Sequence, residues 1–369
     1  MAIWHEKVRV LHPDIPEGSR IIAVSDIHAN ITYFKELLKK IKFTDNDVLI
    51  IVGDFLEKGP ASLETLQYIM NLCNSGNAYA LWGNCDFWSD AILRPNQTAL
   101  DNILKYVLRG KRGILYEMIM AQGLSLDQDT NLMNYVKLLQ NKYHDEWEFL
   151  DSLPTIIETN NYIFVHGGIY PDIPVEEHKI SQVMKFDNFL NQNYSFNKWI
   201  IVGHWPVMLY HQNVVSAVPI IEHERKIISI DGGCVLKDDG QLNALIIPYE
   251  GSSEFKTEWY DPFPTGKALD FQEASNKSYY IRWGDSEVEV LRHGEEFSTC
   301  RHVRTGYVMD ILTKYLFIGE DGKLHTNDCS DYEIGVAPGD TLSIVEETSR
   351  GYYVKNEGVS GWYRGRINK

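Results

Sequence analysis

The sequence contains no apolar run long enough to cross a membrane. No stretch reaches the ~18 apolar residues that a transmembrane helix needs, and residues 1–7 lack the basic start and apolar stretch of an export signal. We therefore expect a cytoplasmic protein that does not enter membranes.

Cysteine is scarce and scattered. The 369 residues include 5 cysteines, an odd number, and none of them forms a Cys-x-x-Cys pair. This spacing excludes a disulfide framework and a zinc knuckle. We expect reduced thiols in a reducing compartment.

Positive charge is also in short supply. The chain has 35 basic and 51 acidic residues, which gives a formal net charge of −16. A surface of this sign repels nucleic acids and anionic membranes, so neither is expected as a partner. A polyanionic substrate would be attracted only where bound cations supply a local positive field.

Five short apolar runs each end in polar residues of kinds that bind metals. They are residues 21–24 before Asp26 and His28, 48–52 before Asp54, 79–82 before Asn84, 162–165 before His166, and 199–202 before His204. Because α/β sheets place their ligands at strand ends, we expect these side chains to meet in one cup. The mixture favours transition metal ions, and two adjacent ions most often indicate hydrolysis at phosphorus.

Strands and helices alternate from about residue 20 to about 85. Apolar side chains recur at helical spacing over 31–41, with Asn30 as the N-cap, and again over 63–73. This pattern predicts a βαβαβ unit with parallel strands. A helical insertion is expected at about 88–150. Further strands are expected at 156–158, 162–165, 199–202, 227–230 and 243–247.

The C-terminal part is rich in strands and turns. We place one domain at 1–262, a linker at Phe263–Gly266 and a β-rich region at 275–369. The last forty-odd residues, which end in Gly361-Trp362-Tyr363 and a glycine turn, resemble a bacterial SH3-like barrel. Such a module would bind a peptide, a cell-wall-like ligand or a second copy of the chain. Its aromatic residues would line that surface or form the core, and they are Tyr352, Tyr353, Trp362 and Tyr363.

In order and approximate spacing, the polar motifs resemble those of the calcineurin-like metallophosphoesterases. The closest branch is that of the phosphoprotein phosphatases, which also includes the symmetrical diadenosine tetraphosphatases. The family pattern is Asp-x-His, Gly-Asp-x-x-Asp-Arg-Gly, Gly-Asn-His-Glu, His-Gly-Gly and a late Gly-His, and roughly residues 20–250 follow it. The resemblance implies an α/β fold, a β-sandwich flanked by helices (αββα), and two divalent metal ions. Manganese is the ion expected first, with iron or zinc as alternatives.

The resemblance also assigns ligands by position. Asp26 and His28 would bind the first ion, Asp54 would bridge both ions, and Asn84, His166 and His204 would complete the second. Residues 230–234 and 242–245 resemble the strand pair that closes the second sheet of the family, in which Asp231 would be architectural.

Two departures from the family pattern concern the catalytic residues. Glu57 and Lys58 stand where the family has Asp-Arg, and Cys85 replaces the histidine that protonates the leaving oxygen. Lys58 would offer charge to a phosphate without the bidentate fork of arginine, and Arg112 from the insertion is a second candidate for this role. General acid catalysis is typically worth ~10²–10⁴ in rate. We therefore hypothesise a preference for good leaving groups, or a substitute acid such as His211.

Other roles are open for Cys85. Its thiol would serve as a reversible redox switch or simply fill the place of the histidine. The expected reaction is hydrolysis of a phosphomonoester, as in phosphoproteins, by a hydroxide that bridges the two metals. Two alternatives are open: hydrolysis of a phosphoanhydride such as a dinucleoside polyphosphate, and a catalytically impaired phosphate sensor or scaffold that works through the SH3-like tail.

Overall fold

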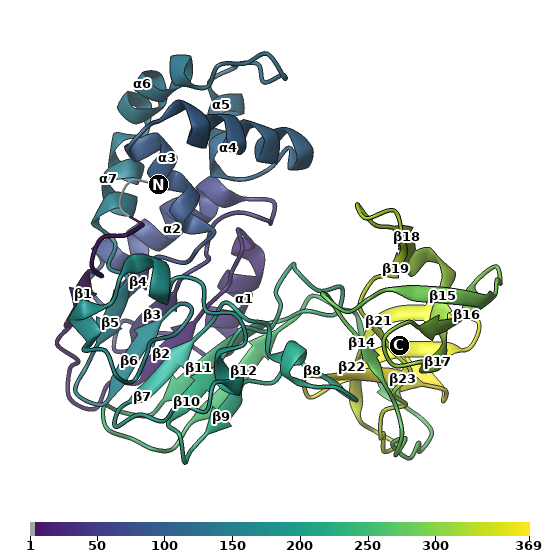
Figure 1. Cartoon of the computed structure of the whole chain (residues 1–369). Coiled ribbons are helices and arrows are strands. Elements are labelled where there is room, and N and C mark those ends of the chain that lie inside the picture. Colours follow the sequence, from purple (N-terminus) through teal and green to yellow (C-terminus); the bar gives the residue numbers. More distant parts are fainter. Residues whose placement is uncertain (1–3) are drawn as a thin grey trace. The chain divides into compact units, whose positions relative to one another are not determined.

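The computed structural model describes residues 4–369, which form two compact units (Figure 1). Unit 1 comprises the described residues through Pro206 together with Pro219–Leu236 and Gly240–Asp261. Unit 2 comprises Val207–Val218, Lys237–Asp239 and Pro262–Lys369. Two short segments, Val207–Val218 and Lys237–Asp239, therefore belong to unit 2 although the chain returns to unit 1 after each of them. The contiguous ranges expected from the sequence, 1–262 and 275–369, do not include these two excursions.

One sheet of unit 1 carries the predicted βαβαβ pattern. Its strands, in spatial order, are β12 (Lys256–Tyr260), β11 (Leu242–Ile247), β2 (Ile21–Val24), β3 (Val48–Val52) and β4 (Ala78–Leu81). Strands β2, β3 and β4 are parallel, as predicted, whereas β11 is antiparallel to β2. The carboxyl ends of the three parallel strands therefore lie at one edge of the sheet.

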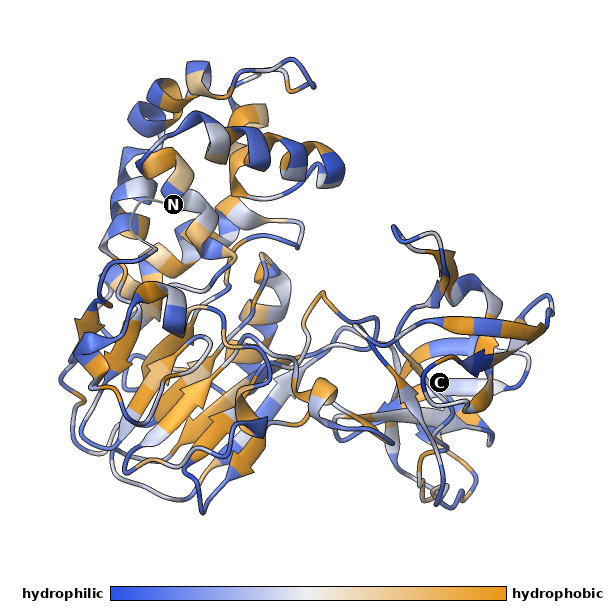
Figure 2. Ribbon diagram, in the orientation of Figure 1, coloured by the Kyte–Doolittle hydropathy of each residue, from blue (hydrophilic) through white to orange (hydrophobic). Residues whose placement is uncertain are grey.

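The second sheet of unit 1 packs against the first. Its order is β1 (Val10–Leu11), β5 (Ile156–Glu158), β6 (Tyr162–Val165), β7 (Trp199–Val202), β10 (Ile227–Ser229) and β9 (Ile220–Glu222). Ile50 and Val52 of the first sheet share one buried cluster with Phe164 and Ile201 of the second. Figure 2 shows these strands as mostly hydrophobic. The β-sandwich expected from the sequence is therefore confirmed.

The predicted strand pair at 230–234 and 242–245 is wrong. Strand β10 pairs with β7 and β9, whereas β11 pairs with β2 and β12 in the other sheet. A single bridge between Gly233 and Gln241 joins the two segments. The chain passes from one sheet to the other here, and local patterning gives no signal for such a change.

Two helices cover the outer face of the first sheet. Helix α1 (Ile31–Lys40) packs on β11 and β12, and α2 (Ser62–Asn74) packs on β4. The Asn30 side chain accepts a hydrogen bond from the backbone N–H of Tyr33 at 3.4 Å, so the predicted N-cap is confirmed. Both helices begin just after loops that bear predicted ligands.

A run of helices follows β4. It consists of η1 (Asp86–Ser89), α3 (Asp90–Leu93), α4 (Gln97–Gly110), α5 (Ile114–Ala121), α6 (Met133–Lys142) and α7 (His144–Ser152). Helix α4 buries Leu100, Ile103, Leu104 and Val107, which share one face at helical spacing. Three short helices lie between β6 and β7: η2 (Val175–Glu177), α8 (Ile180–Val183) and η3 (Phe189–Asn191). Within residues 4–369, no helix combines the length and hydrophobicity needed to span a bilayer.

Unit 2 is almost entirely β-structure. Its largest sheet has the order β24 (Ile367–Asn368), β13 (Thr265–Ala268), β21 (Thr341–Thr348), β22 (Gly351–Asn356), β23 (Val359–Tyr363) and β8 (Val215–Ser216). Smaller sheets comprise β15 (Val288–Arg292) with β16 (Phe297–His302) and β17 (Val308–Leu312), β14 (Tyr280–Ile281) with β20 (Cys329–Ser330), and β18 (Leu316–Ile318) with β19 (Leu324–Thr326). Two short helices, η4 (Val207–Tyr210) and η5 (Thr313–Tyr315), complete the unit.

These sheets are consistent with an SH3-like module, although its limits differ from those expected. Thr265 and Gly266, predicted as linker, begin β13 and pair with β21. Tyr363 is fully buried, and the indole N–H of Trp362 donates to Ser330 O at 2.8 Å. These two late aromatic residues therefore belong to the core of unit 2.

Candidate active site

Backbone hydrogen bonds join the end of β2 to that of β3, and the end of β6 to that of β7. The N–H of Asp26 donates to Gly53 O at 3.0 Å, and that of His28 donates to Asp54 O at 2.9 Å. The N–H of Gly203 donates to His166 O at 3.0 Å. Each of these contacts joins neighbouring strands within one sheet, and between the sheets the backbone N–H of His204 donates to Asp26 Oδ2 at 3.0 Å. They gather all the ligands predicted from the sequence, which are Asp26, His28, Asp54, Asn84, His166 and His204.

Four of these residues have a left-handed backbone. Their φ angles are 54° at Asp26, 48° at His28, 51° at Asp54 and 66° at His204. Such values are uncommon outside glycine and collect at functional sites. Close packing also requires glycine at residue 53, because a Cβ there would lie 2.7 Å from Gly83 Cα. The local backbone is therefore shaped around the cluster of polar side chains.

Asp54 lies at the centre of the cluster. It belongs to two groups of three residues whose ligand atoms all lie within 4.8 Å of one another: Asp26, Asp54 and His166, and His28, Asp54 and Cys85. Its Oδ1 accepts the backbone N–H of Cys85 at 2.7 Å. A carboxylate shared by two such groups is placed to bridge two cations.

The contacts of His166 indicate a cation-binding site. Its Nδ1 lies 3.0 Å from Val52 O, so this nitrogen carries the proton and donates to the carbonyl. Its Nε2 lies 3.1 Å from Asn84 Oδ1 and 3.4 Å from Asp54 Oδ1. The two oxygens favour a positive charge at this point, which is either a proton on Nε2 or a metal ion that replaces this proton.

A second observation supports the same fit. Both ring nitrogens of His28 and the Oδ1 atom of Asp26 are buried, and none of them has a hydrogen-bond partner among residues 4–369. Unpaired buried polar atoms are costly. The donor set of imidazole, carboxylate and carboxamide therefore fits the divalent ions that the family pattern implies.

Two of the histidines are held in the neutral form that metal binding needs. Burial lowers the pKa of His28 to about 4. Burial and the neighbouring His166 lower the pKa of His204 to about 4. In His166 burial opposes the charged form, but the Asp54 carboxylate outweighs it and raises the pKa to about 10.

Sequence reasoning missed Asp187, a partner of His204. The Nε2 atom of His204 lies 2.8 Å from Asp187 Oδ1, and its backbone N–H donates to Asp26 Oδ2 at 3.0 Å. A carboxylate on one ring nitrogen fixes the tautomer and leaves the other nitrogen for a metal. Asp187 lies in a loop between α8 and η3, without any motif that marks it.

Asp86 is a second residue for which the sequence predicted no role. Its carboxylate accepts the backbone N–H groups of Leu56 and Gly83, both at 2.9 Å. It thereby joins the loop after β3 to the loop after β4. Burial, together with the charge of Asp54, raises the pKa of Asp86 well above its ordinary value. Its position directly after Cys85 is the one signal in the sequence that could have identified it.

Glu57 was predicted as a catalytic residue, and the structure gives it a structural contact. Its Oε1 accepts the backbone N–H of Ile114 at 2.9 Å, so Glu57 caps the N-terminus of α5. The side chain is buried, and this burial raises its pKa to about 7. The Glu57 carboxylate is therefore engaged with the helical insertion.

Lys58 and Cys85 remain beside the ligand cluster. The Nζ of Lys58 lies 5.5 Å from the ring centroid of Tyr106, and its charge acts on both His28 and Cys85. The sulfur of Cys85 is buried and accepts a hydrogen bond from Asn84 Nδ2 at 3.5 Å. Arg112 is exposed, and its charge reaches Tyr106.

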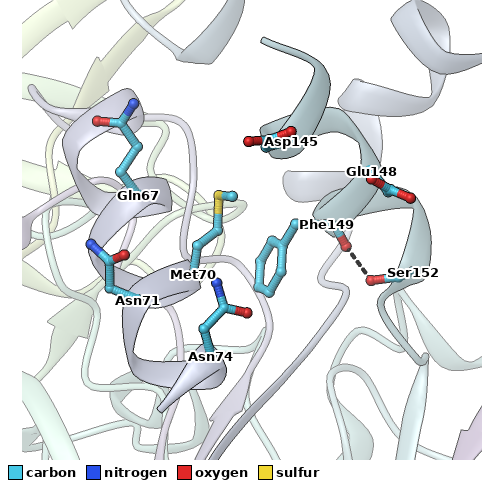
Figure 3. A pocket seen from close by; sticks show the side chains of 8 residues that line it. All are labelled: Gln67, Met70, Asn71, Asn74, Asp145, Glu148, Phe149 and Ser152. Carbon is cyan, nitrogen blue, oxygen red and sulfur yellow. Dashed lines mark hydrogen bonds between the residues drawn. The ribbon is translucent and has the colours of Figure 1, made fainter.

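One groove of unit 1 does not contribute to this cluster. A groove of about 630 Å³ lies between α2 and α7, where Met70 and Phe149 point toward each other (Figure 3). None of the predicted site residues lines it. His211, considered as a substitute acid, belongs to unit 2, where its carbonyl oxygen accepts a hydrogen bond from Arg282.

Known proteins share these motifs over most of unit 1. The pattern of the calcineurin-like phosphoesterase family matches residues 19–227, which is more than half of the chain. A symmetrical bis(5'-nucleosyl)-tetraphosphatase of Wigglesworthia glossinidia brevipalpis is 25% identical over 274 residues, 60% of this chain and 93% of that protein. The asymmetrical bis(5'-nucleosyl)-tetraphosphatase PrpE of Anoxybacillus flavithermus is 24% identical over 257 residues, 61% of this chain and 89% of that protein.

Other matches are shorter or more distant. Two further symmetrical tetraphosphatases match over 45% and 46% of their own lengths. A solved structure of a protein serine/threonine phosphatase from Saccharomyces cerevisiae, with similarity to human phosphatase PP5, is 13% identical with a TM-score of 0.41. That alignment covers 70% of this chain and 84% of the yeast chain. All the polar motifs lie within the matched residues 19–227, and the chain belongs to the calcineurin-like phosphoesterases, metal-dependent hydrolases of phosphoester or phosphoanhydride bonds.

Proposed function

We propose that this enzyme hydrolyses phosphoanhydride bonds of nucleoside polyphosphates, with a nucleotide as the leaving group. The observation that carries the proposal is the altered pair of proton-donor residues: Cys85 replaces the histidine of the family, and Glu57 caps α5. A nucleoside phosphate departs as a stabilised anion and needs little protonation, whereas a serine alkoxide needs a general acid. The names of the two tetraphosphatase relatives support this choice.

The proposed metal ligands are the residues gathered at the sandwich edge. Asp26 and His28 would hold one ion, Asn84, His166 and His204 the other, with Asp54 between them. When bound, two divalent ions supply a nucleophile at neutral pH and neutralise phosphate charge. Manganese is the first ion to test, and iron and zinc are the alternatives.

The remaining residues would orient the substrate. Lys58 would donate hydrogen bonds to a phosphate oxygen, because its ammonium group lies among the side chains around His28 and Cys85. Asp187 would hold the ring of His204 in one orientation, and Asp86 would keep the loops after β3 and β4 in register. Arg112, which is exposed in the turn between α4 and α5, is a further candidate for binding the polyphosphate.

The test is turnover by the purified, manganese-loaded full chain. The panel holds diadenosine tetraphosphate, an aryl phosphate and a phosphoserine peptide. We expect diadenosine tetraphosphate to be hydrolysed with the highest kcat/KM, because its leaving group is the best in the panel. Asp54→Asn should lose this activity, while Asp172→Asn, which changes an exposed aspartate, should retain it.

Faster hydrolysis of the phosphoserine peptide would contradict the proposal and favour the phosphomonoesterase predicted from the family branch. Turnover that does not depend on Asp54 would exclude this site as its source. An absence of turnover with metal bound would favour the sensor or scaffold, with unit 2 as its binding surface. The predicted peptide or self-association partner of unit 2 remains a separate prediction.

A further inference from the structure

Cys85 belongs to a second group of potential metal ligands. Its sulfur, one ring nitrogen of His28 and one carboxylate oxygen of Asp54 all lie within 4.8 Å of one another. The three side chains are buried, with exposed fractions of 7%, 1% and 3%. The family pattern has a histidine at the position of Cys85, where its role is proton donation. Nothing in that pattern makes this position a metal ligand.

The unpaired ring nitrogens of His28 support a cation site in this group as well. Neither ring nitrogen of His28 has a hydrogen-bond partner within the described part of the chain, although the imidazole is almost completely buried. Its Nε2 lies 3.8 Å from Asp26 Oδ1, which is too far for a hydrogen bond. A buried imidazole without a partner loses hydrogen bonds that it makes in water. A cation that accepts its lone pair would offset that loss.

Local contacts hold Cys85 beside this group. Its backbone N–H donates to Asp54 Oδ1 at 2.7 Å, which fixes the start of η1 next to the carboxylate. Its sulfur accepts a hydrogen bond from Asn84 Nδ2 at 3.5 Å, so that Asn84 Oδ1 is directed toward His166 Nε2. These two contacts fix Cys85 between Asp54 and Asn84.

We infer that Cys85 binds, through its sulfur, the divalent ion that is held by His28 and Asp54. One of the two metal positions then has a mixed nitrogen, oxygen and sulfur donor set. On binding, a metal–sulfur bond forms, the S–H bond breaks, and the proton passes to the solvent without any change of oxidation state. A thiolate in the donor set favours zinc over manganese at this position.

This inference goes beyond the proposed function, because it concerns the selection of the metal and not the bond that is hydrolysed. It also gives the substitution of histidine by cysteine a chemical consequence. The chain exchanges a proton donor for a metal ligand at the same position, so that the identity of the bound ion changes together with the preferred leaving group.

The experiment is a cobalt titration of the full chain, prepared metal-free and kept reduced by a phosphine. Equilibrium dialysis measures how many Co²⁺ ions bind, and absorption spectroscopy detects the near-ultraviolet charge-transfer band of a cobalt–sulfur bond. We expect this band in the wild type and its loss in Cys85→Ser. The matched control is Cys234→Ser, which removes another buried thiol whose sulfur donates to Ile27 O. This control should retain the band.

Zinc affinity provides a second readout that does not depend on activity. Cys85→Ser should weaken Zn²⁺ binding by roughly 100-fold, at the upper end of the range for groups that support a metal site, and should affect Mn²⁺ binding less. Bound cobalt without a sulfur band, or a band that persists in Cys85→Ser, would overturn the inference and leave the proposed function intact. A failure to bind any cobalt would overturn both.

Discussion

At the scale of single residues, the ionisation of Glu57 should make the free energy of unfolding depend on pH. Burial raises its pKa from 4.5 to about 7. The stability contributed by its protonated form is therefore complete below about pH 4.5 and is lost as the pH rises toward 7. Glu57→Gln keeps an acceptor for the Ile114 N–H but cannot ionise. We expect the free energy of unfolding of this variant, relative to wild type, to rise between pH 5 and 8 by roughly 2–3 kcal/mol.

The measurement is urea unfolding of metal-free protein at both pH values. Glu36→Gln, on the surface of α1, controls for the introduction of an amide. A difference between Glu57→Gln and wild type that stays constant over this pH range would contradict the prediction.

Asp187 is a positioning residue for a proposed ligand. Asp187→Ala removes the carboxylate that lies 2.8 Å from His204 Nε2. We expect metal affinity to fall by about 10-fold, the lower end of the range for such partners, because the Asp187 side chain is about half exposed. Calorimetric titration with Mn²⁺ measures the change, with Asp172→Ala as the control. Unchanged affinity would show that His204 needs no external support.

The residues that could be found from the sequence share one property. His166 and Asp54 follow buried strands. The carboxyl ends of parallel strands lie at one edge of a sheet, and this does not depend on the conformation of the loops. The contacts of Glu57 and Asp187 depend instead on how α5 and the loop before η3 fold back onto the sandwich. No local pattern encodes such long-range contacts, so the capping role of Glu57 and the partner of His204 could not be predicted.

At the scale of elements, α2 and α5 are joined by a reciprocal pair of caps. Glu57, in the loop before α2, accepts the N–H of Ile114 at the start of α5. Glu117, in the first turn of α5, accepts the N–H groups of Ser62 and Leu63 at 2.7 and 2.8 Å. Ala61, the N-cap of α2, offers no side-chain acceptor. The insertion therefore supplies the cap that its neighbour lacks.

Removing the Glu117 cap should loosen the start of α2. We expect Glu117→Ala to lower the free energy of unfolding by about 1–2 kcal/mol, the cost of a lost helix cap. Hydrogen exchange should accelerate at the amides of Ser62 and Leu63 before the rest of α2. Glu36→Ala, which removes an exposed carboxylate from α1, serves as the control. Unchanged exchange at these two amides would contradict the capping role.

Individual elements were easier to predict than their sheet membership. The apolar spacing after Asn30 is local, and it located α1 together with its cap. The pairing of β13 with β21, and the separation of β10 from β11, depend on segments distant in the sequence. The composition of a strand indicates whether the strand is buried, but it does not indicate which strand pairs with it. These pairings could therefore not be derived from the sequence.

At the scale of the whole molecule, the two units have separate hydrophobic cores. Ile50 and Phe164 belong to the core of unit 1, and Leu342 and Val354 to a core of unit 2. We expect two thermal transitions, of which Mn²⁺ raises only that of unit 1. At a free metal concentration of 100 Kd the gain is about 2.7 kcal/mol, or about 5–10 °C in Tm.

Differential scanning calorimetry with and without Mn²⁺ measures both transitions. Asp54→Asn is expected to abolish the shift in the transition of unit 1, and Asp172→Asn is expected to preserve it. A shift of both transitions by equal amounts would show that the units unfold together.

The segment Val207–Val218, which belongs to unit 2 but lies between two segments of unit 1 in the sequence, affects how the chain folds during synthesis. Strand β8 emerges from the ribosome long before its partner β23, with which it pairs through Ser216 and Val359. At ordinary elongation rates the delay is roughly 10–30 s. Throughout that interval Met208 and Val215, buried in the finished protein, lack part of their final surroundings. The finished surroundings of strand β8 therefore form only when translation is nearly complete.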